Sequence, residues 1–155
     1  MTTVAAQLRD IYSQNTRSVL SNVCLAKAGL GIGTGTNTKI KMANTVTYAI
    51  DGIIYSATTA EVAHTTVTVQ STATDRVYLV CINAAGTLSI IAGTEAAVGS
   101  ALCPMPTTGL CAIGAMLITT TSTAFTPNTS VAGTNNTATY YDLMRVPAGR
   151  ILGTL

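Results

Sequence analysis

Charged side chains are scarce in this sequence. Only 9% of its 155 residues are charged, whereas an ordinary soluble domain has about 25%. Disordered chains combine few apolar residues with many charges, and here 48% of the residues are apolar, so we expect the chain to fold. Charge also keeps free proteins apart. Its shortage is typical of a molecule fixed in an assembly, although a secreted adhesin has the same property.

The groups that perform catalysis or bind metals are also few. His64 is the single histidine, and no Gly-x-Ser-x-Gly surrounds any serine. The spacing of the six carboxylates suggests no pair facing across a cleft. The four cysteines and His64 do not have the clustered spacing of a zinc site. We therefore expect no enzyme, no catalytic residue, no metal and no cofactor.

Two classes of partner are disfavoured. The net charge is +2 and the basic residues are spread along the chain, whereas nucleic-acid binding needs a dense basic patch. The apolar run 110–118 has nine residues, and a membrane helix needs about 20. The Gly-rich segment 29–37 fails the phosphate-loop pattern, because Thr34 and Thr36 occupy positions that need glycine. We expect neither nucleic acid nor membrane as a partner.

Three of the four cysteines lie within apolar runs. Cys24, Cys81 and Cys111 have this setting, in which a free cysteine packs as a small apolar residue. We expect buried, reduced thiols made in a cytoplasm, with a disulfide as the alternative.

The N-terminal region has a helical pattern. Apolar residues recur near one face from Thr3 to Ala28, and Gly29 suits the position after the end of a helix. This face packs either on the protein's own sheet or on a neighbouring subunit. We take it as the candidate interface with another subunit or with a shell, and its residues are Val4, Leu8, Ile11, Tyr12, Val19 and Val23.

The rest of the chain has the pattern of β structure. Thr makes up roughly a fifth of the residues, and this β-branched residue suits a pleated surface. We divide the chain into an N-terminal helix (1–28), a Gly/Thr-rich connector (29–38) and a β domain (39–155). Asp51-Gly52 predicts a hairpin with a two-residue turn. Its register would pair Ile50 with Ile53, Tyr48 with Tyr55, and Val46 with Ala57.

Further strands follow the hairpin. Alternation in 65–70 predicts a strand with Val67 and Val69 facing inward. The continuous apolar runs 77–82 and 111–118 predict central strands buried on both faces, and shorter patterns predict strands near 88–90 and 138–144. The predicted fold is mainly β: an antiparallel β-sandwich or barrel of about seven strands, preceded by one N-terminal α-helix.

The β region has a characteristic order of motifs. A Thr-rich strand runs into Tyr48-Ala49-Ile50-Asp51-Gly52, and a buried strand reaches the turn 83–86. Further along come Pro104-Met105-Pro106, the run 109–118, Phe125-Thr126-Pro127-Asn128, Tyr140-Tyr141-Asp142 and Val146-Pro147. In this order the β region resembles small virion structural proteins of tailed bacteriophages, over about two thirds of the chain and without the N-terminal helix. The resemblance implies a capsid decoration or cement protein, a head fibre, or a tail-fibre or collar part, usually oligomeric and often a trimer, with no catalytic residues.

Three functions follow from these observations. The first is a decoration or cement protein that stabilises the phage head as an oligomer, with itself and the major capsid protein or other virion proteins as partners. It would be located in the virion, after assembly in the host cytoplasm. The alternative is a fibre or collar protein for host attachment, in which the polar stretch 119–137 contacts host glycan. An enzyme is the third, and no constellation of residues supports it.

Overall fold

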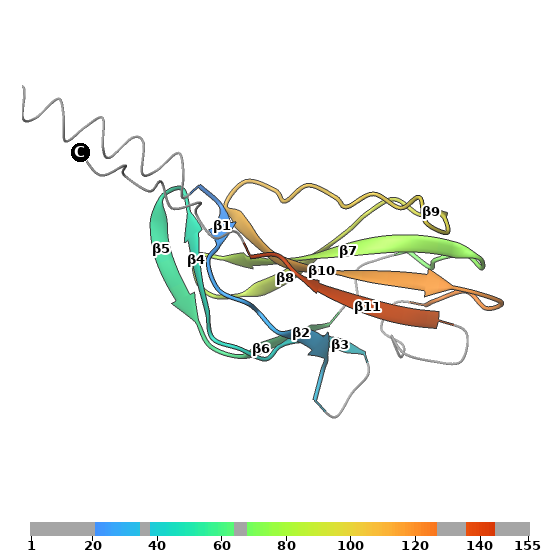
Figure 1. Ribbon diagram of the computed structural model, residues 1–155, viewed down its shortest axis with the longest axis horizontal. Helices are drawn as coiled ribbons and strands as arrows, with labels where there is room; N and C mark the ends of the chain where they lie inside the picture. The colour runs from blue at the N-terminus through green and yellow to red at the C-terminus, as the bar shows by residue number, and fades with distance from the viewer. Residues whose placement is uncertain (1–20, 35–37, 64–67, 127–135, 145–155) are drawn as a thin grey trace, which may run out of the picture.

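The structure is a computed structural model that describes residues 21–34, 38–63, 68–126 and 136–144. These residues form antiparallel β-strands and no helix, arranged in two layers (Figure 1). Among them there is consequently no helix with the length and apolar character that crossing a membrane requires. The prediction of a mainly β, antiparallel fold is confirmed, and the described strands do not close into a barrel.

The first layer is a five-stranded sheet. Its two longest strands, β7 and β10, pair with each other at its centre, and β11 and β8 flank them in the order β11-β10-β7-β8. The short β9 pairs with the start of β7. The strands are β7 (Thr74–Asn83), β8 (Leu88–Ala92), β9 (Ala96–Ala97), β10 (Leu110–Thr120) and β11 (Asn136–Asp142).

The second layer is a bent ribbon of three segments. Each segment contributes one strand to each of two small sheets. These sheets have the orders β1-β4-β5 and β2-β3-β6. Since β1 and β2, β3 and β4, and β5 and β6 are consecutive in the chain, each segment runs through both sheets. The strands are β1 (Val23–Cys24), β2 (Leu30–Ile32), β3 (Lys39–Met42), β4 (Val46–Ile50), β5 (Ile53–Ala57) and β6 (Ala60–Ala63).

The hairpin at Asp51-Gly52 has the predicted register. Asp51 and Gly52 have φ values of 51° and 79°, as the two central residues of a type I′ turn require. Ile50 pairs with Ile53, and the cross-strand pairs Tyr48–Tyr55 and Val46–Ala57 follow. The two tyrosine rings stack with centroids 5.7 Å apart.

The main core lies between the two layers. The ribbon contributes fully buried side chains such as Ile40, Met42 and Tyr48, and the five-stranded sheet contributes Tyr78 and Met116 among others. The hydroxyl of Tyr48 also donates a hydrogen bond of 2.8 Å to the carbonyl of Asn83, which ties the ribbon to the β7–β8 turn. Apolar burial and this polar tie together hold the layers face to face.

The strands β7 and β10 are also covered on their outer face. Leu79, Cys81 and Ala115 form a second buried cluster there. The connection 93–109, between β8 and β10, runs over this side of the sheet (Figure 1). It begins at Gly93, where a Cβ atom would lie 2.9 Å from the carbonyl oxygens of Val77 and Leu102. The prediction that 77–82 and 111–118 form central strands is confirmed, since β7 and β10 each pair on both sides.

The predicted helix does not continue to Ala28. Asn22 has a φ of 51°, and Val23–Cys24 forms β1, in which Val23 pairs with Ala49. Pairing with β4 and burial of both β1 side chains outweigh the helical pattern there. Residues 3–20 of the predicted helix lie outside the described residues. The segment 29–38, expected to be a connector, contains β2, which pairs with β3.

The predicted inward position of Val69 is wrong. Val69 is 53% exposed, and the next residue, Gln70, is fully buried instead. The Gln70 backbone bridges to Phe125, and its side-chain amide donates hydrogen bonds to the carbonyls of Thr74 and Ile118. The two side-chain bonds satisfy the amide N–H groups, while the buried Oε1 atom has no partner among the described residues. Val67 lies outside the described residues.

A substitution at Gly114 tests the packing of the sheet against the ribbon. Gly114 follows the irregularity in β10 between residues 112 and 114. A Cβ atom there would collide with the Leu30 side chain and lie 2.6 Å from the carbonyl oxygen of Tyr141. We expect Gly114→Ala to lower the free energy of unfolding by about 1–3 kcal/mol or more, measured by urea denaturation. Gly31→Ala is the matched control, since nothing lies within 4 Å of its Cβ position. Equal stability of the two variants would contradict this packing.

Candidate functional site

An apolar groove of about 390 Å³ lies on the outer face of the five-stranded sheet. Its sheet residues are Val77, Ala115 and Leu117. The connection 93–109 contributes Ala101 and Cys103 from one side, and Tyr141 and Leu143 contribute from the side of β11. The groove therefore lies where the connection leaves the outer face of β10 and β11 uncovered.

Asp75 is the one ionisable carboxyl residue in this groove, and its side chain is engaged. It is only 3% exposed, and its Oδ2 atom accepts a 2.7 Å hydrogen bond from the backbone N–H of Gly99. This contact ties the connection to β7 at Gly99, near its middle. The groove consequently offers apolar contact area rather than charge to anything that enters it.

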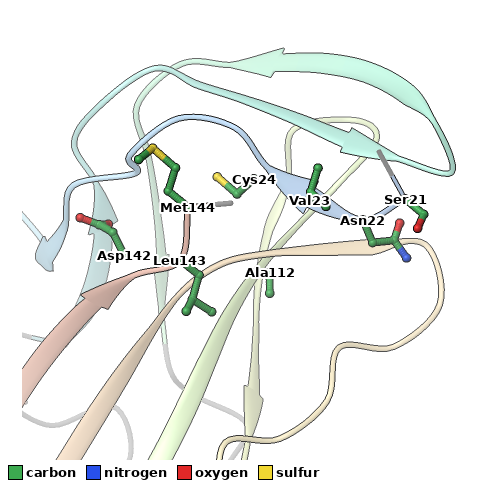
Figure 2. A pocket seen from close by; sticks show the side chains of 8 residues that line it. All are labelled: Ser21, Asn22, Val23, Cys24, Ala112, Asp142, Leu143 and Met144. Carbon is green, nitrogen blue, oxygen red and sulfur yellow. The ribbon is translucent and has the colours of Figure 1, made fainter. Parts of the chain in front are cut away.

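A second hollow of about 320 Å³ adjoins the groove at the end of β11 (Figure 2). Leu143 lines both hollows. Residues 21–24 lie on one side of this corner pocket, and Asp142 and Met144 on the other (Figure 2). The corner pocket therefore lies where both the first and the last described residues meet.

The thiol in the corner pocket is not activated. Burial raises the pKa of Cys24, a backbone hydrogen bond at Ala26 lowers it, and the nearby Asp142 carboxylate raises it, so that the net pKa is raised. Burial likewise raises the pKa of Cys81 to about 11 and of Cys111 to about 12. A thiol must ionise to act as a nucleophile or metal ligand. These three are buried, uncharged thiols at neutral pH, as expected for apolar packing, and all four cysteines are unpaired.

The described carboxylates share a structural role. Four of them each accept a hydrogen bond from a backbone N–H that is distant in sequence. The pairs are Glu61 with Thr34 (2.6 Å), Asp75 with Gly99 (2.7 Å), Glu95 with Ser71 (3.1 Å) and Asp142 with Leu30 (3.0 Å). Each pair joins two segments that are far apart in the sequence, so we refer to these four carboxylates as staples.

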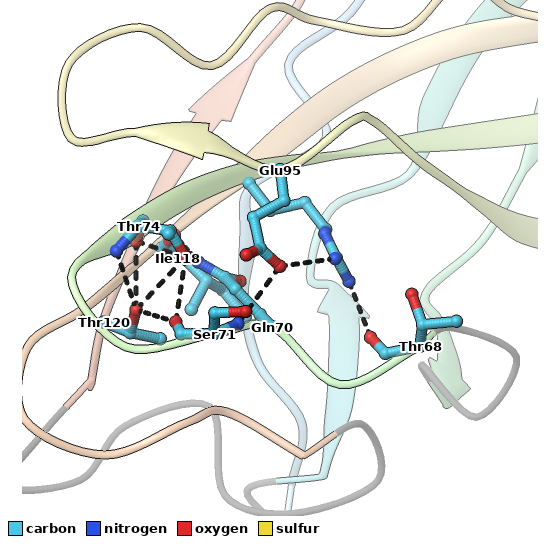
Figure 3. A network of polar contacts seen from close by, with 8 residues as sticks. Thr68, Gln70, Ser71, Thr74, Glu95, Ile118 and Thr120 are labelled. Carbon is cyan, nitrogen blue, oxygen red and sulfur yellow. Dashed lines mark hydrogen bonds and ion pairs between the residues drawn. The ribbon is translucent and has the colours of Figure 1, made fainter.

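Glu95 also forms an ion pair with Arg76, the one largely buried cation among the described residues (Figure 3). Arg76, 5% exposed, forms an ion pair of 2.9 Å with Glu95 and donates a 2.6 Å hydrogen bond to the carbonyl of Thr68. Hydrogen bonds from Ser71 are the largest cause that lowers the pKa of Glu95; burial opposes them in part, and the nearby Arg76 lowers the pKa further. The ion pair therefore joins the segment 68–71 and the connection 93–109 to β7.

A second part of the same network is built from uncharged groups (Figure 3). The Thr120 hydroxyl donates to the carbonyl of Ser71 at 2.6 Å and accepts the backbone N–H of Thr74 at 3.1 Å. Gln70 completes it through its bonds to Thr74 and Ile118. These side chains bond to one another and to the backbone, so the network stabilises the end of the sheet.

Of the predicted interface residues, the structure describes Val23. This residue lies in β1, is 6% exposed and lines the corner pocket. Val4, Leu8, Ile11, Tyr12 and Val19 lie outside the described residues, as does His64. No group of three potential metal ligands occurs in the described ranges.

The sequence contained one signal for the groove that its interpretation missed. In β10 the outer positions Ala112, Ala115 and Leu117 are apolar, as are the inner ones. A continuous apolar run predicts a strand buried on both faces, but the connection covers the outer face of β10 only in part.

No known protein family, curated protein or solved structure matches this chain. Its function is therefore inferred from the geometry of its own residues.

The different exposure of the four thiols predicts which of them reacts in the folded protein. Cys103 is exposed, while Cys24, Cys81 and Cys111 are buried. In the folded protein we expect a thiol reagent such as dithionitrobenzoate to modify Cys103 alone, and all four cysteines only after unfolding in guanidinium. Cys103→Ser should remove the reaction of the folded state. A second thiol that reacts at a similar rate in that variant would contradict the described packing.

The Glu95 staple predicts a dependence of stability on pH. The folded state lowers the pKa of Glu95, so its stabilisation is complete above the ordinary pKa of a glutamate, about 4.3, and is lost as the pH falls through the lowered value. We expect Glu95→Gln to be less stable near neutral pH and to lose less free energy of unfolding between about pH 6 and pH 3. Asp51→Asn is the control, because this turn carboxyl forms no ion pair among the described residues. Identical pH profiles for wild type and Glu95→Gln would contradict the role of the staple.

Proposed function

We propose that this protein is a structural component of a virus particle: a capsid decoration or cement protein that binds the phage head shell as an oligomer and stabilises it. Its partners are other copies of itself, arranged as a trimer as the resemblance implies, and the major capsid protein or other virion proteins. It acts by contact and not by catalysis. Its location is the virion, after assembly in the host cytoplasm, and its β layers form an open sandwich.

The observation that carries this proposal is the apolar groove together with the large apolar side chains near it. Six such side chains on the connection and at the end of β11 are each at least 41% exposed: Val98, Leu102, Met105, Tyr141, Leu143 and Met144. Free monomers seldom expose apolar surface of this kind in continuous patches. Coverage by a neighbouring subunit or a shell protein removes it from water.

The low charge supports the same proposal. Association through this surface gains about 25 cal/mol for each Å² of apolar area buried, before the costs of ordering. The described carboxylates near the groove are engaged as staples, and thus little charge has to be desolvated. A neutral contact of this kind suits permanent attachment to a particle better than rapid exchange.

The alternative is a tail-fibre, collar or head-fibre protein in host attachment. It rests on the polar stretch 119–137, of which residues 127–135 lie outside the described residues. Copy number separates the two functions, because a decoration protein covers the whole shell and a fibre occurs at few positions.

The proposal is tested on virus particles purified from cells that express the chain. Quantitative mass spectrometry of separated heads and tails should find it in the heads, at one or more copies per capsomer. A few copies per particle, confined to tails, would favour the fibre function. Absence from particles would refute a structural role in the virion.

A paired substitution tests whether the groove makes the contact. Tyr141→Lys places a charge in the groove, at a side chain that is 50% exposed. We expect this variant to fold and to bind heads lacking the protein at least about tenfold more weakly, because a lysine has to be desolvated in the contact. Val69→Lys, at a residue that is 53% exposed and does not line the groove, is the control and should bind normally. Equal binding of both variants would exclude the groove as the contact surface.

A further inference from the structure

Among the described strands, β5 is an edge of the second layer that carries no charged residue and no proline. In the part of the chain that the structure describes, β5 pairs only with β4 and stands last in the order β1-β4-β5. Figure 1 shows it at the margin of the ribbon. Natural edge strands are usually guarded by charged residues, proline or bulges. Residues 52–60 contain no charged residue and no proline.

The strand β5 has an exposed apolar side chain on each of its two faces. Ile53 and Ile54 are neighbours and therefore point to opposite faces, yet they are 59% and 58% exposed. The edge at β6 is different, because Glu61 there contacts Thr34 and lies 3.9 Å from Lys39. Of these two neighbouring edge strands, β5 is therefore the one without a charged residue.

The hairpin register determines which backbone groups are free. In a two-residue hairpin, the residues that flank the turn exchange backbone hydrogen bonds, and such pairs then alternate along the strands. Ile53, Tyr55 and Ala57 therefore direct their N–H and C=O groups toward β4. Ile54 and Ser56 direct theirs to the free edge.

We propose that β5 of one copy pairs antiparallel with β5 of a second copy, about a two-fold axis at Tyr55. This register uses the whole strand: Ile54 and Ser56 exchange backbone hydrogen bonds with Ser56 and Ile54 of the second copy. Ile53 then lies opposite Ala57, and Tyr55 lies opposite its own equivalent. The β1-β4-β5 sheets of the two copies then form one continuous sheet.

A second copy suits this edge because the register is self-complementary and brings no like charges together. All opposed side chains within β5 are apolar or hydroxylic. Asp51 at the turn falls opposite Thr59 of the other copy and not opposite a carboxylate. A two-fold contact of this kind uses the same patch on both chains.

The size of the contact predicts its strength. Five residues span about 17 Å, and one pair of short strands covers well below the roughly 800 Å² per partner of a stable complex. The pairing is therefore weak between free chains and becomes strong where an assembly presents many copies. The β5 pairing goes beyond the proposed function, since it does not depend on a virus particle. It links two chains whichever oligomer forms through the groove.

Sedimentation of the purified full-length chain tests the proposal. We expect wild type to show concentration-dependent two-fold association that Ile54→Lys weakens at least tenfold, because a lysine on the edge opposes pairing. Val69→Lys, an exposed aliphatic residue outside β5, is the matched control and should associate as wild type. Association that is absent in wild type, or the same in Ile54→Lys, would overturn the proposal. Neither result bears on binding to heads.

Disulfide trapping tests the register. Residues opposite each other in a pair without hydrogen bonds have Cα atoms about 4.5 Å apart, within the range that a disulfide spans. In a Cys103→Ser background, Tyr55→Cys should form a covalent dimer on oxidation. Ile53→Cys, which faces Ala57 of the other copy, should not. Circular dichroism checks that both variants fold. A folded Tyr55→Cys variant that stays monomeric, or equal trapping of both variants, would overturn this register.

Discussion

The pairing of β7 with β10 is the constraint on which the rest of this structure depends. Each strand is buried on its inner face against the bent ribbon, and the connection 93–109 covers part of its outer face. The irregularity between residues 112 and 114 adds a residue to β10, which lets both Ile113 and Met116 remain in the inner core. Loss of either covering layer would leave an apolar strand pair in contact with water, so both coverings are required.

Four of the described carboxylates serve this architecture. They reach across 24 to 112 positions of sequence to accept backbone N–H groups. An N–H left unpaired in a partly buried segment costs free energy comparable to a lost hydrogen bond. In a protein with few charges, these carboxylates therefore supply acceptors that the neighbouring uncharged segments lack.

Local patterns allowed much of the fold to be predicted. The two-residue turn at Asp51-Gly52 determined the hairpin register, because it depends only on neighbouring residues. Continuous apolar runs indicated β7 and β10 correctly. The strand β1 and the burial of Gln70 were missed because both depend on partners far along the chain, Ala49 and Ile118. The groove was missed for a similar reason: alternation shows that a face is apolar, but not whether the chain's own loop covers it.

The corner pocket brings together Ser21 and Met144, the first and last described residues. The described β body therefore begins and ends at one corner. A change in that corner would act on β1 and on the end of β11 together, although they are more than a hundred residues apart in the chain.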